Sequence, residues 1–316
     1  MVTCFSYNKR MKRHLKTVAL CIVCLLIIMF GQFFSKKSKP TEQKVQGYKQ
    51  ILELWHIDSF DGGIGSRKDF LLSSAVAFEK KNNVIVSVIS HTIQSAQVAL
   101  EKSLPDMISC GNGLNISNLK TLPISSNYGV CSYNGNNYGT AWARGVYALI
   151  GSGEKKNLIV SQGEYTQPLL ALEKSGIKFD SIEILPSSKA YGEYLRRGGY
   201  LLGTQRDVYR LFNRQAEFEY QALGGYSDLF QVISVTTENT KKVNLCIDFI
   251  AYLLSSSVQK NLTKIGMFST MGHTLYKGQI TEKLEQAEIK EFTSFLTSPE
   301  KLKQMQKDSL KKLQGA

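Results

Sequence analysis

The sequence predicts an α/β fold of two lobes that follows an N-terminal transmembrane anchor helix. Three features support this prediction: a strand–loop–helix–strand unit at residues 51–90, alternating strand and helix patterns from residue 158 onward, and a basic-flanked apolar run at residues 17–34. About 276 residues follow the anchor region, and a chain of that length favours two lobes over a single hydrophobic core.

The unit at residues 51–90 has the clearest pattern. An apolar run at residues 51–55 has the length of a strand, and glycines in residues 62–65 end it. Apolar side chains then recur at helical spacing in residues 70–78, and the β-branched segment 84–90 predicts a second strand. Such a crossover makes the two strands parallel. We therefore expect the loop at residues 59–67 at the carboxyl ends of strands, where open α/β sheets bind ligands.

The later elements follow in chain order, after an irregular stretch at residues 115–137. Strands are expected at residues 107–109, 138–151 and 229–237, a strand, turn and helix in residues 158–176, and further strands or helix starts at residues 179–187 and 199–212. Helices are expected at residues 93–104, 243–266, 281–296 and 298–313. Ser298 directly before Pro299 predicts an N-cap followed by a first-turn proline.

The first 40 residues contain an uncharged apolar run between two basic clusters, and no acid. The run is about long enough to cross a bilayer, and the basic flank before it predicts that the rest of the chain is translocated. A cleaved signal peptide is an alternative, although residues 31–33 fit a small-x-small cleavage site poorly. A lipoprotein is another, although Leu20 and Val23 precede the two cysteines. We expect an uncleaved anchor in the cell membrane, with the binding domain outside the cytoplasm.

The net charge of +13 comes largely from the anchor region. Eight of the 39 Lys and Arg residues lie in residues 1–40, which leaves 31 against 26 Asp and Glu. A nucleic-acid interface needs a clustered basic face, and residues 41–316 show no such cluster. We therefore expect no nucleic-acid partner.

Cysteine and histidine spacing predicts no metal site. Cys110, Cys131 and Cys246 lie outside the anchor, and the four histidines are scattered. The sequence leaves open whether Cys110 and Cys131 form a disulfide. GxSxG nucleophile elbows are absent, and no Ser/His/Asp order argues for catalysis. We expect a protein that is not an enzyme and needs no cofactor.

Five regions, in chain order, carry a family resemblance. They are LELWHIDSFDGGIGSR with the helix after it, PDMISCGNG, YGTAWARGVYALIG, GYLLGTQRDVYRLFNR with GGYSDLFQVISV, and FIAYLLSSSVQKNLTKIGMFST. Along nearly all of residues 48–275 the chain thus resembles the extracellular solute-binding proteins of bacterial ABC importers, in the sugar-type group called family 1. No single motif is specific. The chain departs from the family pattern because it lacks a lipobox and has only two tryptophans.

The resemblance implies a clamp like that of periplasmic binding proteins, which closes on its ligand about a hinge. It implies that residues 41–145 with 228–275 form one lobe and that residues 146–227 with 276–316 form the other. The implied function is capture of a small solute, expected to be a carbohydrate, in the cleft between the lobes. A monomeric protein would then deliver that solute to the membrane subunits of an ABC permease.

Candidate ligand contacts lie where expected strands end. The first loop contributes His56, Asp58, Asp61 and Arg67. Asp and Arg side chains can bind sugar hydroxyls through paired hydrogen bonds. The alternative is that Asp61 only caps the turn and that Arg67 is solvated.

The rest of the chain contributes six further candidates: Asn112, Trp142, Gln205, Arg206, Asp207 and Tyr226. Trp142 is the strongest of them, because it lies at the implied crossing between lobes and its ring could stack on the apolar face of a pyranose. An ordinary core tryptophan is the alternative. Trp55 is expected in the core, and Asp207 is also a normal first-turn residue of a helix.

Other functions stay open. The glycine loop before residue 67, at a helix N-terminus, would also suit an anionic solute through backbone N–H groups and the helix dipole. An amine or amino-acid-like solute is a further candidate. An anchored ectodomain would also suit a ligand sensor that partners a signalling receptor.

Overall fold

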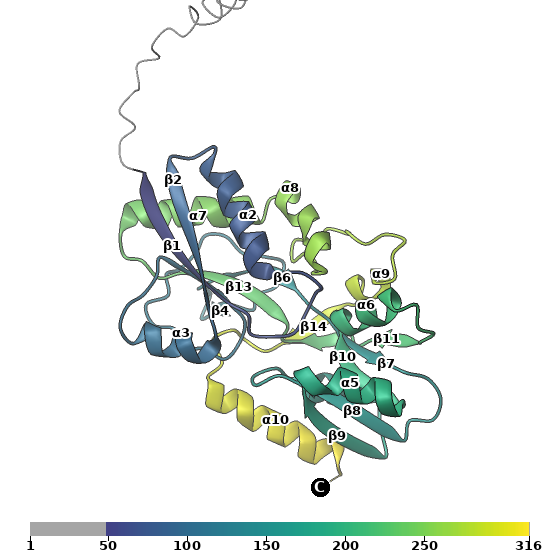
Figure 1. Ribbon diagram of the computed structural model, residues 1–316. Helices are drawn as coiled ribbons and strands as arrows, with labels where there is room; N and C mark the ends of the chain where they lie inside the picture. Colours follow the sequence, from purple (N-terminus) through teal and green to yellow (C-terminus); the bar gives the residue numbers. More distant parts are fainter. Residues whose placement is uncertain (1–48, 316) are drawn as a thin grey trace, which may run out of the picture. The chain divides into compact units, whose positions relative to one another are not determined.

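Two five-stranded sheets organise residues 49–315, the part of the chain that the computed structural model describes (Figure 1). The predicted α/β fold with two lobes is confirmed. The expected anchor in residues 1–40 lies outside the described residues. Within residues 49–315, no helix is both long and apolar enough to cross a membrane.

The first sheet has the strand order β2-β1-β3-β13-β6. β1 (Gln50–Ile57) pairs in parallel with β2 (Val84–His91) and with β3 (Met107–Cys110). β13 (Phe230–Val235) lies antiparallel between β3 and β6 (Thr140–Arg144). The parallel pairing predicted for the first two strands is thus confirmed.

Helices pack on the first sheet according to the alternation of its side chains. Leu54 of β1 belongs to the same core cluster as apolar residues of α2 (Arg67–Glu79) and α7 (Thr240–Leu253). The neighbouring Trp55 belongs to a second cluster with Ala96 of α3 (Ile93–Leu100). This is the alternation expected of a strand, whose successive side chains point to opposite faces.

The second sheet has the strand order β11-β7-β10-β8-β9. Its strands are β7 (Tyr147–Ile150), β8 (Asn157–Gln162), β9 (Ser181–Pro186), β10 (Tyr200–Thr204) and β11 (Tyr220–Ala222). β8 pairs in parallel with both β9 and β10, while β7 is antiparallel to its two neighbours. The carboxyl ends of β8, β9 and β10 therefore lie at one edge of this sheet.

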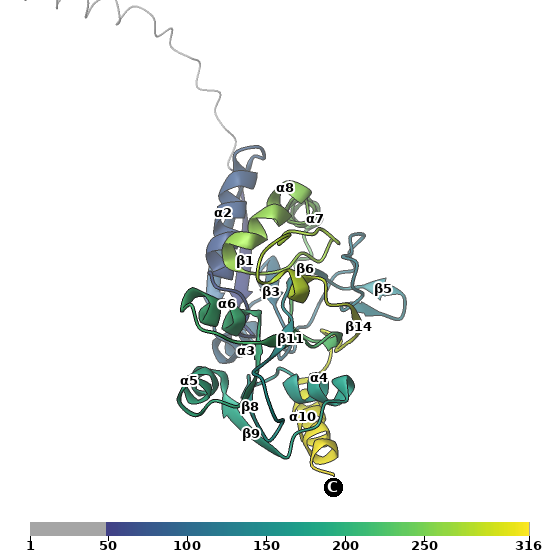
Figure 2. The ribbon, with the colours of Figure 1, turned by 90° about the vertical axis from the view of Figure 1, so that its right-hand side faces the viewer.

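Helices flank the second sheet on both faces. Figure 2 shows α4 with α10 on one side of β8 and β9, and α5 on the other. The bounds are α4 (Pro168–Ser175), α5 (Ser187–Arg197), α6 (Gln205–Asn213) and α10 (Pro299–Leu313). Val160 packs in one core cluster and the adjacent Ile159 in another, so both faces of the sheet are buried.

The chain passes between the sheets at Gly145, directly after β6, and returns at Leu229, directly before β13. The Gly145 N–H donates a 2.7 Å hydrogen bond to the Leu229 carbonyl, so these two crossings lie side by side. The single strand expected at residues 138–151 is therefore two strands, one in each sheet.

Two helix predictions in the last quarter of the chain are corrected. The expected helix at residues 243–266 is broken near Ser255 into α7, α8 (Ser256–Gln259) and the 3-10 helix η1 (Lys260–Ile265). The expected helix at residues 281–296 is only one turn, α9 (Glu282–Glu285), followed by a strand, β14 (Ile289–Phe292). Parallel pairing of β14 with β12 (Gly225–Ser227) overrides the helical periodicity there.

Two smaller predictions can also be compared with the structure. The helix predicted at residues 298–313 is confirmed, and the Ser298 hydroxyl accepts a hydrogen bond from the Lys301 N–H as its N-cap. The stretch expected to be irregular, residues 115–137, contains a short hairpin of β4 (Ser132–Tyr133) and β5 (Asn136–Asn137). The three cysteines among the described residues are buried free thiols.

Candidate functional site

A cavity of about 460 Å³ lies where strand ends of the two sheets meet. The loop between β1 and α2 supplies most of its wall, and the ends of β8 and β9 and the start of α6 supply the rest. The lining residues are Asp58, Ser59, Phe60, Asp61, Gly62, Gly63, Ile64, Gly65, Arg67, Gln162, Gly163, Ser187 and Arg206. Pockets of this volume are typical of sites for small ligands.

Asp58 is the charged centre of the β1–α2 loop. Its Oδ1 atom accepts a 2.7 Å hydrogen bond from Arg67 Nε and lies 3.1 Å from His56 Nε2. Burial alone would raise the pKa of Asp58. The hydrogen bond with His56 and the charge of Arg67 outweigh that effect and hold this pKa well below its usual range. Asp58 is therefore an anion at neutral pH, with Oδ1 already occupied.

His56 supports this arrangement from behind. Its ring is buried, with 1 % exposure, and Nδ1 lies 3.4 Å from the Ser109 hydroxyl. His56 is not among the residues that line the cavity. His56 therefore positions Asp58 and does not face the cavity.

Arg67 is held from several directions but keeps one free nitrogen. Its side chain stacks over the Phe60 ring, with Cζ 4.2 Å from the ring centroid, and Nη2 donates to the Phe60 carbonyl. Burial lowers its pKa, and the Asp58 charge opposes that shift. The residue is 5 % exposed, and buried Nη1 has no hydrogen-bond partner. The alternative of a solvated Arg67 is thus excluded.

Asp61 and Arg206 connect the two sides of the cavity. Arg206 Nη1 donates a 2.5 Å hydrogen bond to Asp61 Oδ1, from α6 of the second sheet to the β1–α2 loop. The Arg206 side chain is 35 % exposed and the Asp61 side chain 46 %, so solvent screens the pair. This ion pair therefore links the two walls of the cavity.

The loop glycines serve close packing against η1. A Cβ atom on Gly63, whose φ is +77°, would lie 2.1 Å from the Ile265 carbonyl oxygen. That same oxygen accepts hydrogen bonds from the N–H groups of Ile64 and Gly65, and the Ser66 hydroxyl caps α2 through the Asp69 N–H. Three backbone N–H groups at this loop, those of Ile64, Gly65 and Asp69, are therefore already bonded.

The second sheet contributes polar groups that are less fully bonded. Gln162, at the end of β8, lines the cavity and has a buried Oε1 atom without a hydrogen-bond partner. Ser187 begins α5, and no side chain caps that helix. No side chain therefore bonds to the N–H groups of its first turn.

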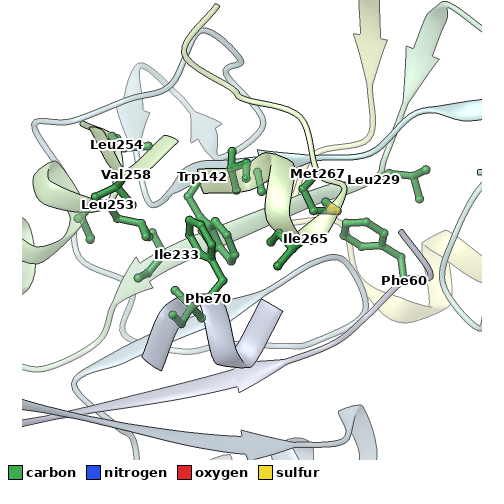
Figure 3. Close-up of a cluster of buried hydrophobic side chains, with 14 of the residues drawn as sticks. Phe60, Phe70, Trp142, Leu229, Ile233, Leu253, Leu254, Val258, Ile265 and Met267 are labelled. Carbon is green, nitrogen blue, oxygen red and sulfur yellow. The ribbon is translucent and has the colours of Figure 1, made fainter. Parts of the chain in front are cut away.

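Trp142 is a core residue (Figure 3). The ring is 0 % exposed, stacks on Phe70 with a centroid distance of 5.3 Å, and donates from Nε1 to the Ser109 hydroxyl at 3.0 Å. It has no face free for a sugar, so the expected stacking role is not supported. Trp55 lies in the core as expected, with 5 % exposure.

Four other candidates lie away from the cavity lining. Gln205 is buried and accepts a hydrogen bond from the Val146 N–H at the first crossing. Asp207 completes a capping box with Thr204, and burial raises its pKa. The Tyr226 hydroxyl pairs with Thr293 in the core. Asn112 is 9 % exposed, and its Nδ2 atom has no hydrogen-bond partner.

The cavity thus unites four of the ten candidates: Asp58, Asp61, Arg67 and Arg206. Ser59 and Phe60 belong to the loop that was expected at the ligand-binding edge, although neither was named as a candidate; Gln162, Gly163 and Ser187 were missed. Gln162 is the last residue of β8 and Ser187 directly follows β9, so the rule of strand carboxyl ends could have found them.

Comparison with protein-family models and with curated proteins found no match for this chain. Solved structures do match. A cyclo/maltodextrin-binding protein in complex with maltotetraose is 11 % identical, covers 86 % of this chain and 94 % of its own, and has a TM-score of 0.56. Iron-bound HitA from Pseudomonas aeruginosa is 13 % identical, covers 82 % and 99 %, and has a TM-score of 0.51.

A third structure is described as a two-component system protein that mediates signal transduction. It is 14 % identical, covers 81 % of this chain and all of its own, and has a TM-score of 0.55. At such low identity these likenesses establish the fold and no particular ligand. The described residues have the two-lobed α/β fold of periplasmic binding proteins.

Proposed function

We propose that this chain is an extracytoplasmic solute-binding protein that captures a small polar solute between its two lobes. The observation that carries the proposal is the cavity, which residues from both sheets line. Asp61 and Arg206 form an ion pair across the cavity and so link its two walls. This function requires no catalytic residues.

We further propose that the protein acts as a monomer at the outer face of the cell membrane and passes its solute to an ABC permease. The similarity to a maltodextrin-binding protein and to HitA supports capture of a solute. The basic-flanked apolar run in residues 17–34 supports anchoring.

A carbohydrate is one candidate solute, because carboxylates and guanidinium groups can bind sugar hydroxyls. The cavity offers little for stacking, however. Phe60 is the aromatic residue among those that line it, and Arg67 covers that ring. Charged and hydrogen-bonding groups dominate the lining, which favours a strongly polar solute.

A ligand-sensing role is the second candidate function, supported by the similarity to a two-component system protein. Uptake of a labelled solute by cells with and without the chain separates the two roles. Transport predicts that uptake falls when the chain is deleted, whereas sensing predicts unchanged uptake and a lost transcriptional response.

Isothermal titration calorimetry tests solute capture directly. The full-length chain, purified in a mild detergent, is titrated with sugars, amino acids, polyamines and oxyanions. Arg206→Gln alters the cavity wall, and Arg196→Gln removes an exposed arginine of α5 as the matched control. Saturable binding that Arg206→Gln changes and Arg196→Gln does not supports the proposal. Equal binding by both variants would place the solute elsewhere.

A further inference from the structure

We infer that the captured solute carries an oxyanion, which binds between Arg67 and the N-terminus of α5. This inference rests on the proposed function and names the chemical class of its solute. It is carried by two independent features of the cavity: a buried guanidinium with an unpartnered nitrogen, and an uncapped helix start on the opposite wall.

Arg67 supplies the first feature. Two of its three nitrogens are engaged, Nε with Asp58 and Nη2 with the Phe60 carbonyl. Nη1 is buried and has no partner. Guanidinium groups bind carboxylate and phosphate oxygens through paired N–H groups. A solute oxygen that reaches this wall would complete the hydrogen bonding of a residue whose other contacts already hold it in place.

The start of α5 supplies the second feature. This helix has 11 residues, Pro186 occupies its N-cap position, and no side chain bonds to its first turn. Ser187, its first residue, lines the cavity. N–H groups that no side chain caps, together with the helix dipole, favour negative charge at such a position. α2 differs, because Ser66 caps it and the Ile265 carbonyl binds the N–H groups of Ile64 and Gly65.

The acidic residues in the lining do not forbid an anion. Asp58 is bonded to Arg67, and Asp61 is bonded to Arg206, so each carboxylate is neutralised by a guanidinium. Arg206 is 35 % exposed and could turn toward a bound anion. The unpartnered Oε1 atom of Gln162 would accept a hydrogen bond from a donor group elsewhere on the solute.

The test places one negative charge at two adjacent positions of α5. Ser187→Asp adds a carboxylate inside the cavity, and Ser188→Asp adds the same charge to the same helical turn at an exposed residue outside the lining. Aspartate is favoured in the first turn of a helix, so both variants should fold. Calorimetry of the full-length parent and variants uses sulfate, inorganic phosphate, succinate and glutamate as oxyanion probes, and glucose, maltose and putrescine as uncharged or cationic ones.

The inference expects at least one oxyanion probe to bind the parent. Ser187→Asp should weaken that binding at least tenfold, which is about 1.4 kcal/mol, while Ser188→Asp stays within twofold. Arg67→Lys, which keeps the charge but loses the planar group, should also weaken it about tenfold, with circular dichroism as a check on folding.

Three results would overturn the inference. Binding of an uncharged or cationic probe without any oxyanion would refute it and leave solute capture standing. Equal loss in Ser187→Asp and Ser188→Asp would show only a general charge effect. Binding by none of the probes would count against both the oxyanion and the proposed function.

Discussion

The carboxylate of Asp228 accepts a 2.8 Å hydrogen bond from the hydroxyl of Tyr147, and this bond joins the two crossings between the sheets. The second carboxylate oxygen accepts from the Gln167 N–H at 3.0 Å. Asp228 is 4 % exposed. Burial raises its pKa to about 7, although the hydrogen bonds from Tyr147 and Gln167 oppose that shift.

The raised pKa of Asp228 predicts a pH-dependent stability. The native state holds its proton at a higher pH than the unfolded state, where the pKa is near 3.8. Stability therefore rises as pH falls from about 7 toward 4, by up to ~1.4 kcal/mol per pH unit from this group. Asp228→Asn should flatten that part of the profile, as measured by urea unfolding at several pH values. If Asp228→Asn shows the same dependence of stability on pH as the parent, Asp228 is not the group responsible.

Trp142→Ala should lower stability and leave solute affinity unchanged at equal folded fraction. Removing a fully buried tryptophan costs ~3–5 kcal/mol. Trp142→Phe keeps a ring against Phe70 and loses the hydrogen bond to Ser109, so a smaller loss of about 1–2 kcal/mol is expected. Urea unfolding measures the stability and calorimetry the affinity. A tenfold loss of affinity in folded Trp142→Phe would restore a ligand-binding role for this residue.

Gly63→Ala should destabilise the β1–α2 loop, because the new methyl group would lie 2.1 Å from the Ile265 carbonyl oxygen. Gly135→Ala is the matched control. Its φ of +78° is close to the +77° of Gly63, but nothing lies within 4 Å of the added atom. Backbone strain is thus shared, at ~1–3 kcal/mol, and the difference in unfolding free energy reports the contact with η1. Equal losses of unfolding free energy in the two variants would show that η1 shifts to accommodate the new methyl group at no cost.

The Asp61–Arg206 pair should affect binding more than stability. Exposed ion pairs contribute about 0.2–1 kcal/mol, so Asp61→Asn should change the free energy of unfolding little. If Arg206 also serves an anion, releasing it should raise oxyanion affinity roughly 1.5- to 5-fold, and Arg206→Gln should lower it. Calorimetry at low and high salt measures both effects. A fall in affinity for Asp61→Asn would instead assign Asp61 to the solute.

Half-buried and buried segments with strong local patterns were predicted well. The parallel pairing of β1 with β2 follows from two strand-like runs on either side of an amphipathic helix. The last helix follows from Ser298 and Pro299 at its start. The strand-end rule also located Asp58, Asp61 and Arg67, because the side chains after a parallel strand lie at the ligand-binding edge wherever the chain goes next.

Contacts between distant segments decided the rest. β14 forms because its backbone pairs with β12, more than sixty residues earlier in the chain. This pairing overrides the helical periodicity of the local sequence. Trp142 is buried because Phe70 and Ser109 from other segments surround it. The Ile265 carbonyl binds two N–H groups of the glycine loop, whereas no side chain caps the first turn of α5. Periodicity and caps are local properties that a sequence displays directly. Which surface a side chain finally contacts depends on segments about 30 to 200 residues apart, and only packing brings those together.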